Sequence, residues 1–377
     1  MIYLDYSATT PVNDEVLDTF VNVSKNYIGN PNSLHRLGVE AKELIDASTK
    51  QIAKLLGVKE KEIIYTSGSS ESNNTAIMGV INKYPNRGKH IITTKLEHSS
   101  IISPLSYLQN NGYDVDFVEA DENGRVTVEN VQKLIRKDTV LVSIGAVNSE
   151  VGVVQPIEEI GKLLKDYPTI IFHSDITQAV GKIKINLENI DLASISAQKF
   201  YGIKGVGCLI KKENIQIEPL IHGGKSTTVY RSGTPALALI VSMSKALRLA
   251  LDNLDQKYNR VLELNKYLVD KLKDIKEVHI NSNEFCYPYV VNLSIVNIKS
   301  EVLLHALEKE DIYISTQTAC STSNYSMAVY EVTKNEEYAA HSLRISLSYL
   351  TTEEELDTFV EVFKEKIKEL DLKNESN

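Results

Sequence analysis

Short apolar runs alternate with amphipathic stretches along most of the chain. Each run has about the length of a buried strand and is followed by a segment with helical spacing or by a turn rich in small residues. The predicted strands cover residues 62–66, 90–94, 113–119, 139–144, 169–174, 192–196 and 208–210. Strands that alternate with helices indicate right-handed crossovers and a mainly parallel sheet. We therefore expect an α/β fold whose functional residues gather at the carboxyl ends of the strands.

The pattern changes after a long helical stretch that begins at Pro235. Further strands and helices are then predicted, with strands at 278–282, 289–296, 312–315 and 342–347 and helices near 300–310 and 352–370. This mixture predicts a smaller α+β domain. We expect a large domain over residues 13–255 and a small domain formed by residues 1–12 and 256–377. A chain of 377 residues, 42% of them hydrophobic, is long enough to bury two cores.

Charge and composition argue against several classes of protein. The net charge is −9 and the lysines form no basic stripe, so nothing supports binding to nucleic acid. No apolar stretch reaches the roughly 20 residues that span a bilayer, and the first residues lack the features of a signal peptide, so we expect a cytoplasmic protein. Three dispersed cysteines, Cys208, Cys286 and Cys320, fit neither a disulfide framework nor a zinc site of the CxxC type, and we expect no metal.

The first candidate for chemistry is a lysine in a turn between two predicted strands. Residues 194–208 have the sequence SISAQKFYGIKGVGC, in which Lys199 follows a strand and three glycines come after it. A lysine that faces an apolar pocket loses hydration, so its pKa falls and its amine can form a Schiff base with an aldehyde such as pyridoxal phosphate (PLP). Taken alone, a lysine in a loop is more often a solvated surface charge.

A carboxylate at the end of the preceding strand supports this interpretation. The apolar run at 169–174 leads into Asp175, followed by Thr177 and Gln178. PLP chemistry needs a carboxylate on the pyridine nitrogen, because the protonated ring is the electron sink. A helix cap or turn cap is the alternative role for Asp175 alone.

Hydroxyl-rich turns and a histidine add to this set. Residues 67–74, SGSSESNN, lie between a strand and a helix, where backbone N–H groups and hydroxyls hold phosphates, although a simple helix cap has the same composition. The loop at 222–234, HGGKSTTVYRSGT, is a second candidate of this kind. His98 follows the strand at 90–94 and could stack on a pyridine ring, with a capping or surface histidine as the alternative.

Two further candidates lie in the predicted small domain. Residues 315–326, STQTACSTSNYS, are small and polar without periodicity, which predicts a mobile exposed loop around Cys320. Free cysteines are usually buried and inert, as we expect for Cys208, whereas an exposed loop cysteine suggests chemistry. Arg344 is isolated in a predicted strand, so it needs an anionic partner, either a substrate carboxylate or a structural Asp or Glu.

The ordered set of motifs resembles the class V aminotransferase family of PLP enzymes, and within it the cysteine desulfurases of the NifS and IscS type. The similarity extends over nearly the whole chain. Its motifs include YLDYSATTPV at the start, TSG..ES.N at 66–74, EH at 97–98, HSDITQ at 173–178, K.YG.KG.G at 199–207, RSGT at 231–234, and AC.S and LR.SL near the end. The resemblance implies a homodimeric PLP-dependent transferase of fold type I.

The resemblance also implies roles around the cofactor. Lys199 would form the Schiff base, Asp175 would pair with the ring nitrogen, Gln178 would bond the phenolic oxygen, and His98 would stack on the ring. The residues implied to hold the phosphate are Ser69, Ser70, Ser196 and, from the other subunit of the dimer, Thr234.

The implied substrate contacts include two departures from the family pattern. Arg344 and Asn148 would bind the substrate, and Cys320 would attack its sulfur. Ser149 stands where the family has an asparagine that is expected to contact the cofactor or the substrate carboxylate. Gln198 replaces the usual histidine and can still donate to the phosphate. Both departures bear on substrate affinity more than on the type of reaction.

The implied activity is removal of sulfur from L-cysteine, which leaves L-alanine and a persulfide on Cys320. The sulfur would pass to acceptors for iron–sulfur cluster assembly or tRNA thiolation. One alternative is another enzyme of the same fold, an aminotransferase or a selenocysteine lyase, and transamination would not need Cys320. Another alternative is a weakly active sulfur-delivery protein, which the change at Ser149 suggests. A visible absorbance band that changes when cysteine is added would separate these alternatives.

Overall fold

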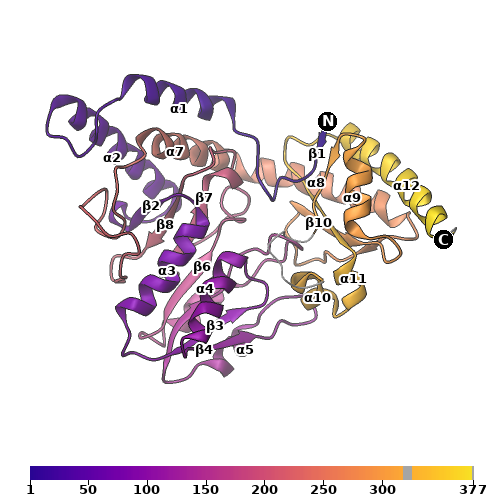
Figure 1. Cartoon of the computed structure of the whole chain (residues 1–377), viewed down its shortest axis with the longest axis horizontal. Helices are drawn as coiled ribbons and strands as arrows, with labels where there is room; N and C mark the ends of the chain where they lie inside the picture. The colour runs from indigo at the N-terminus through magenta and orange to yellow at the C-terminus, as the bar shows by residue number, and fades with distance from the viewer. Residues whose placement is uncertain (317–324, 376–377) are drawn as a thin grey trace.

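The computed structural model describes residues 1–316 and 325–375. A seven-stranded sheet forms the centre of the larger of two lobes (Figure 1). Its strands are β2 (Ile63–Thr66), β3 (His90–Thr94), β4 (Asp114–Val118), β5 (Thr139–Ser143), β6 (Ile171–Asp175), β7 (Leu192–Ser196) and β8 (Gly207–Lys211). The order is β2-β8-β7-β6-β5-β3-β4, and every neighbouring pair is parallel except those that include β8. The predicted α/β fold with a mainly parallel sheet is confirmed.

Helices cover both faces of this sheet because neighbouring strand residues point to opposite sides. Ile91 packs in the apolar layer with α3 and α4, whereas Ile92 packs in the layer with α2, α5, α6 and α7. The helices are α1 (Asp14–Asn26), α2 (Arg36–Leu56), α3 (Ser69–Lys83), α4 (Ser99–Asn110), α5 (Val128–Leu134), α6 (Ile157–Leu164), α7 (Leu237–Leu251) and α8 (Leu254–Lys273). In the described part of the chain, none of the helices has both the length and the apolar content needed to cross a membrane.

The long helical stretch expected after Pro235 is in fact two helices. α7 ends at Leu251, and Asn253 adopts a left-handed conformation with φ of 54° before α8 begins. Asparagine tolerates this conformation better than most residues, which is why a helical pattern can break there without a glycine. Two short helices, α10 (Met327–Thr333) and α11 (Glu336–Ala340), were not among the expected elements.

The smaller lobe is built around a three-stranded antiparallel sheet. In it, β10 (Val290–Ser294) lies between β9 (His279–Ile280) and β12 (Ser342–Ser346), and the helices of this part are α9 (Ser300–Glu308) and α12 (Glu353–Glu375).

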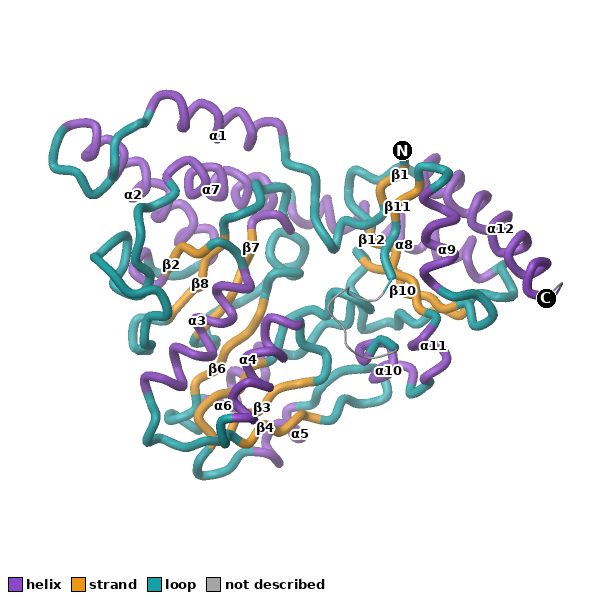
Figure 2. Tube along the Cα trace, viewed as in Figure 1, coloured by secondary structure: helices purple, strands orange, loops and turns teal. Residues whose placement is uncertain are grey.

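The first residues of the chain pair with this lobe rather than with the large sheet. β1 (Ile2–Tyr3) is parallel to β11 (Ile312–Tyr313), and the two lie side by side in Figure 2. The expected boundaries, 13–255 against 1–12 with 256–377, stay a prediction, and this strand pairing agrees with them.

Candidate active site

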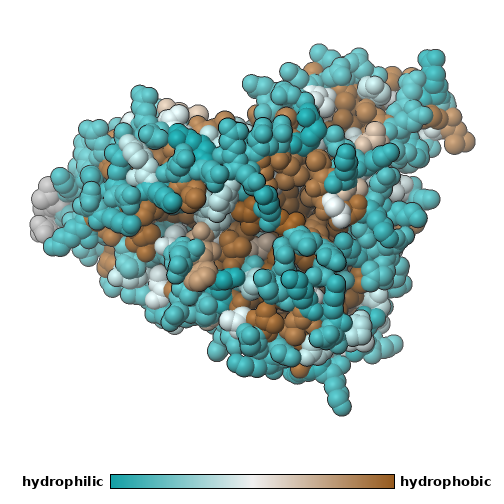
Figure 3. Space-filling view, turned by 180° about the vertical axis from the view of Figure 1, so that it is seen from behind, coloured by the Kyte–Doolittle hydropathy of each residue, from teal (hydrophilic) through white to brown (hydrophobic). Residues whose placement is uncertain are grey.

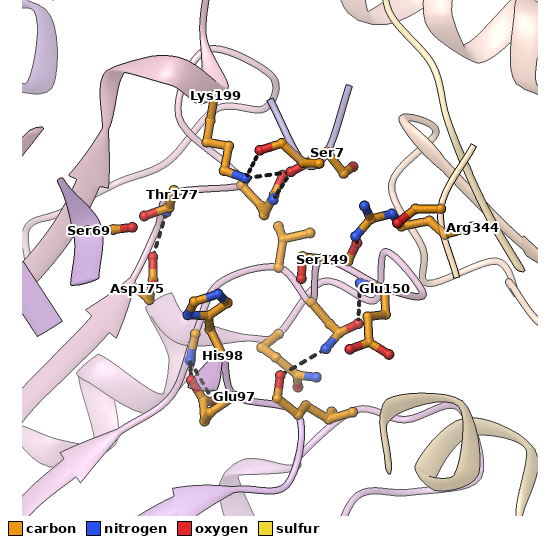
Figure 4. A pocket seen from close by; sticks show the side chains of 18 residues that line it. Ser7, Ser69, Glu97, His98, Ser149, Glu150, Asp175, Thr177, Lys199 and Arg344 are labelled. Carbon is orange, nitrogen blue, oxygen red and sulfur yellow. Dashed lines mark hydrogen bonds between the residues drawn. The ribbon is translucent and has the colours of Figure 1, made fainter. Parts of the chain in front are cut away.

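A cavity of about 340 Å³ lies at the carboxyl ends of the parallel strands (Figure 4). Its walls come from the segments after β3, β5, β6 and β7, from the start of α3, from the N-terminal arm at residues 5–10, and from β12. The predicted site residues that line it are Ser69, His98, Asn148, Ser149, Asp175, Gln178, Lys199 and Arg344. The large sheet and the small lobe therefore contribute to one site.

Lys199 ends a single 3-10 turn that follows β7 (Ala197–Lys199). Its Nζ donates to the carbonyl oxygens of Ser7, at 2.6 Å, and Ala8, at 2.7 Å. Burial, and secondly the nearby Arg344 guanidinium, lower the pKa of Lys199 to about 8, although Asp175 acts in the opposite direction. A lysine with this pKa is partly neutral near physiological pH, so its amine can act as a nucleophile or a base.

The N-terminal arm holds the turn that contains Lys199. The backbone N–H of Thr10 donates to the Gln198 carbonyl at 2.9 Å, and the Thr10 hydroxyl accepts from the Tyr201 N–H at 2.8 Å. Tyr201 has a φ of 64°, which is uncommon for a residue with a side chain. Backbone contacts of this kind have no sequence signature, so this role of the arm was not predicted.

Asp175 is fixed by two donors at the end of β6. Its Oδ1 accepts from the Thr177 N–H at 2.9 Å, and its Oδ2 accepts from the Asn73 amide at 2.8 Å. Asp175 thus caps a turn, which was the alternative role, and also lines the cavity. Asn73 is fully buried in α3 and also donates to the Ser100 hydroxyl at 2.8 Å. It was not predicted, because one asparagine inside a polar helix start carries no distinctive signal.

The protonation of His98 follows from its hydrogen bonds. His98 caps α4, and its Nδ1 accepts from the Ser100 backbone N–H at 3.1 Å. Since that N–H can only donate, Nδ1 has no proton and the Ser100 hydroxyl, 2.8 Å away, also donates to it. Burial lowers the pKa of His98, so the ring is neutral and carries its proton on Nε2. His98 therefore both caps α4 and lines the cavity.

Glu97 is a buried carboxyl group beside this histidine. Its oxygens accept from the Gly145 N–H at 3.0 Å and from the Thr94 hydroxyl at 2.7 Å. Burial raises the pKa of Glu97 to about 7. These bonds attach the turn after β3 to the segment after β5, and a Cβ at Gly145 would lie only 3.1 Å from the Glu97 carboxylate.

Arg344 has a structural carboxylate as its partner. It is 4% exposed, and its Nη2 lies 2.7 Å from Asp5 Oδ1, while its Nη1 donates to the Ser149 carbonyl at 3.2 Å. The Arg344 Nε is buried and has no hydrogen-bond partner among the described residues. A structural carboxylate was one of the two expected partners of Arg344, and Asp5 is that partner. The other expected partner, a substrate carboxylate, stays a prediction.

Asn148 and Ser149 shape the segment after β5. The Asn148 amide donates to the Leu96 carbonyl at 2.8 Å and accepts from the N–H groups of Glu150 and Val151, both at 2.9 Å. Asn148 therefore folds its own loop, and its role as a substrate contact stays a prediction. Ser149 meets Arg344 through its backbone carbonyl, which does not depend on the side chain.

The expected phosphate residues do not all face the cavity. Gly68, not a serine, is the N-cap of α3, and within the described residues it makes no side-chain cap bond to the first N–H groups of the helix. Ser70 lines a neighbouring open groove between α3 and α4, and Thr234 is exposed, so their roles stay predictions. Ser196 donates from its hydroxyl to Gln198 Oε1 at 2.5 Å, and a Cβ at Gly68 would lie 3.2 Å from the Ser196 hydroxyl.

The residues present fit PLP. The start of α3, where Gly68 provides no side-chain cap bond, offers N–H donors for a phosphate, and the partly neutral Lys199 offers an amine. The Arg344 Nε, which has no partner among the described residues, can still donate to a carboxylate. Asp175 offers a carboxylate at the strand end. The volume of about 340 Å³ is in the usual range of small-molecule sites.

The described cysteines are poor nucleophiles. Cys208 is fully buried in β8, where burial raises its pKa well above the usual range, and burial raises the pKa of Cys286 to about 11. The expected inert character of Cys208 agrees with this. Cys320 lies outside the described residues.

The comparisons with known proteins agree with this geometry. The family model for aminotransferase class V matches residues 2–359. A relative described as cysteine desulfurase IscS, from Dictyoglomus turgidum, is 39% identical over 377 residues, which cover 98% of this chain and 95% of the relative. A solved structure described as a NifS-like protein has a TM-score of 0.92 at 35% identity and covers 97% of this chain and 99% of its own. Another, described as SspA in complex with cysteine, has a TM-score of 0.81 at 30% identity, with 93% and 100% covered.

The sheet, with the buried lysine and the carboxylate at the strand ends, has the architecture of a fold type I enzyme. The chain belongs to the class V aminotransferase family of PLP-dependent enzymes, and within it to the group of cysteine desulfurases of the IscS and NifS type. The resemblance predicted from the motifs is confirmed, and so is the reaction type that it implied.

Proposed function

We propose that the protein is a homodimeric cysteine desulfurase that uses PLP to convert L-cysteine to L-alanine and leaves a persulfide on Cys320. The observation that carries the proposal is the Lys199 amine, which has a pKa lowered to about 8 and shares one cavity with Asp175, His98 and Arg344. The similar solved structure described as SspA in complex with cysteine supports cysteine as the substrate.

PLP, when bound, supplies an electron sink for the carbon that loses its proton. Around it, the chain's own residues divide the work. Arg344 would bind the substrate carboxylate through the guanidinium edge that includes Nε, which has no partner among the residues that the structure describes. Lys199 would act as the base for the Cα proton, because its amine is partly neutral. Asp175 would hold the ring nitrogen with its carboxylate, whose position is fixed by the hydrogen bond from the Asn73 amide.

His98 is suited to donate a proton rather than to accept one. Its Nδ1 is occupied by two donors from Ser100, so only the Nε2–H is free for the cavity. The C–S bond of the substrate breaks when the Cys320 thiolate takes the sulfur, and its electron pair remains on the carbon side, which must then gain a proton. A neutral histidine with its proton on Nε2 can supply one.

A second copy of the chain is part of the proposal. Thr234 is exposed here, and its implied role is in the site of the other subunit. Apolar residues gather near the middle of the face shown in Figure 3. Exposed apolar side chains also occur on α1, α2 and the loop between them, namely Leu17, Val21, Tyr27, Ile28, Leu34, Leu37 and Val39. Surfaces of this kind typically pack against another protein.

The sulfur carried by Cys320 would pass to an acceptor protein. The acceptors would be proteins for iron–sulfur cluster assembly or tRNA thiolation, in the cytoplasm.

The test is to measure sulfide and alanine formed from L-cysteine with and without a thiol reductant. Both should appear in equal amounts with the reductant. Cys320→Ser should bind PLP and change its spectrum when cysteine is added, yet release almost no sulfide, and Lys199→Ala should lose turnover altogether. Without reductant, mass spectrometry should find one extra sulfur on the peptide that contains Cys320. Normal sulfide release by Cys320→Ser would instead favour another enzyme of this fold, one that breaks the C–S bond without a thiol nucleophile, whereas loss of the amino group without sulfide release would favour an aminotransferase.

A further inference from the structure

A second lysine is buried directly behind the cavity. Lys182 follows β6 and is 5% exposed, and its Nζ donates to Gln178 Oε1 at 2.9 Å. The rings of Tyr287 and Tyr289 lie beside it, each with its centroid 5.9 Å from Nζ. No carboxylate pairs with Lys182 in the part of the chain that the structure describes.

The surroundings of Lys182 are unfavourable for a charge. Burial, and then the cations Lys199 and Arg344, lower the pKa of Lys182 to about 7. Burying an amine without an anion costs free energy, so such a lysine is rarely present for stability alone. The chain reaches this position through Gly181, whose φ is 75° and whose missing Cβ would lie 2.8 Å from Ala250 Cβ.

Lys211 shows how this chain buries a lysine for structure. It is 2% exposed and donates to two backbone carbonyls, those of Ile215 at 2.8 Å and Lys212 at 3.2 Å. Two carboxylates, Glu62 and Glu213, counteract the effect of burial on its pKa. Lys182 has no such carboxylate within residues 1–316 and 325–375, and its acceptor is Gln178, a side chain that lines the cavity.

The contact with Lys182 determines which way the Gln178 amide points. The Lys182 amine and the Tyr287 hydroxyl both donate to Gln178 Oε1, at 2.9 Å and 3.4 Å, and in its protonated form Lys182 can only donate, so Gln178 Oε1 faces Lys182. The Gln178 Nε2 then faces the other way and donates to the Ser7 carbonyl at 2.9 Å, at the wall of the cavity. A reversed amide would place two donors together at Lys182 and two acceptors together at Ser7.

We propose that Lys182 is a positioning residue, which holds the Gln178 amide with its N–H edge toward the cavity and polarises it, so that Gln178 is a stronger donor to an anionic oxygen of the bound cofactor. This inference rests on the proposed use of PLP. A hydrogen bond that withdraws charge from the amide oxygen strengthens the N–H donor of the same amide. A freely reversing amide would instead present its carbonyl oxygen to that anion.

The test uses the PLP-loaded protein without substrate and follows the pH titration of its visible absorbance. Lys182→Met removes the donor in a side chain of similar length. It should raise the titration midpoint by about one pH unit, because the cofactor's oxygen then holds its proton more tightly. Lys182→Gln keeps a neutral donor and should raise it by less. If Lys182→Met and Lys182→Gln raised the titration midpoint equally, the effect of Lys182 would come from its charge alone. That result would overturn the positioning role.

A double-mutant cycle shows whether the effect passes through Gln178. In a Gln178→Leu background, Lys182→Met should cause no further shift, whereas an undiminished shift would overturn the inference. Lys211→Met is the matched control, since it removes another buried amine, and it should leave the midpoint unchanged.

Stability and cofactor loading are controlled separately. The PLP-free Lys182→Met protein should melt no lower than wild type, because a methionine fills the same space without a buried amine. A wild-type protein with no visible band after incubation with PLP would overturn the proposed function together with this inference. A normal band whose midpoint is unchanged in Lys182→Met would overturn only the role of Lys182.

Discussion

Replacing Asp5 by asparagine should destabilise the protein and at the same time make it respond more strongly to a carboxylate ligand. Asp5 is 21% exposed and lies 2.7 Å from Arg344, which is 4% exposed. Removing one partner of a buried ion pair costs about 3 to 5 kcal/mol, because the other charge stays buried. We expect the lower end, since Asp5 is partly hydrated and Arg344 keeps its bond to the Ser149 carbonyl.

The expected change in melting temperature follows from the length of the chain. With about 2.1 cal/mol/K of unfolding entropy per residue, 377 residues convert a loss of about 3 kcal/mol into a Tm lower by about 4 °C. Saturating L-alanine, the proposed product, should then raise the Tm of the PLP-loaded Asp5→Asn protein more than that of wild type. In the variant, the ligand carboxylate is the main anion for Arg344 rather than a second one.

The matched control is an ion pair of the same length on the surface. Asp255 Oδ2 lies 2.7 Å from Lys184 Nζ, and both side chains are more than 70% exposed, at 72% and 75%. Asp255→Asn should change the Tm by little, because exposed pairs contribute roughly 0 to 1 kcal/mol. Thermal melts of the three proteins with and without L-alanine decide the matter. Equal Tm values for both variants, or equal stabilisation of wild type and Asp5→Asn by L-alanine, would refute the reasoning.

Three further outcomes follow from the titratable groups. Covalent capture of PLP by the cofactor-free protein should accelerate with pH around a midpoint near 8, the lowered pKa of Lys199, and a rate still rising steeply at much higher pH would contradict the desolvation of that amine. Burial lowers the pKa of His173 from 6.5 to about 4, so the unfolded state binds more protons and stability should be complete above pH 6.5 and decline toward pH 4. Denaturant melts should show a flatter decline for His173→Gln but not for the exposed control His305→Gln. Nitrogen-15 NMR should show His98 protonated on Nε2 at pH 7, and a proton on Nδ1 would contradict the bond from the Ser100 N–H.

Most strands of the large sheet could be predicted because they are buried on both faces and rich in apolar residues, whereas the edge strand β4 is partly exposed and alternates polar with apolar residues. The positions of Asp175 and Lys199 followed, since the carboxyl ends of parallel strands meet at one edge. The order of the strands and the polarity of the residues that follow them were enough to predict where Asp175 and Lys199 lie. The break at Asn253 could not be predicted, because the apolar spacing of α7 and α8 continues across it and the interruption depends on backbone geometry at one residue.

Other parts of the site depend on contacts that leave little trace in the sequence. Ser7 acts through its carbonyl oxygen, which every residue possesses, and it meets Lys199 from 192 positions away. Lys182 is a single charge in the segment between the predicted strands at 169–174 and 192–196, which is the usual pattern of a surface lysine. Its place four residues after Gln178 is the one signal that could have drawn attention to it.

The N-terminal arm ties the two lobes together at the reactive lysine. The Ser7 N–H donates to the Ser346 hydroxyl of β12 at 3.0 Å, while its carbonyl accepts from Lys199 at 2.6 Å and from Gln178 at 2.9 Å. If PLP binds as proposed, the Lys199 amine would no longer donate fully to this carbonyl. Gln178 then becomes the main donor that keeps the Ser7 carbonyl satisfied at the cavity wall. Because the proposed role of Lys182 is to fix the direction of the Gln178 amide, that lysine would also keep the Gln178 donor directed at the Ser7 carbonyl, while the bonds of Ser7 to Ser346 and of Thr10 to Gln198 hold the rest of the arm.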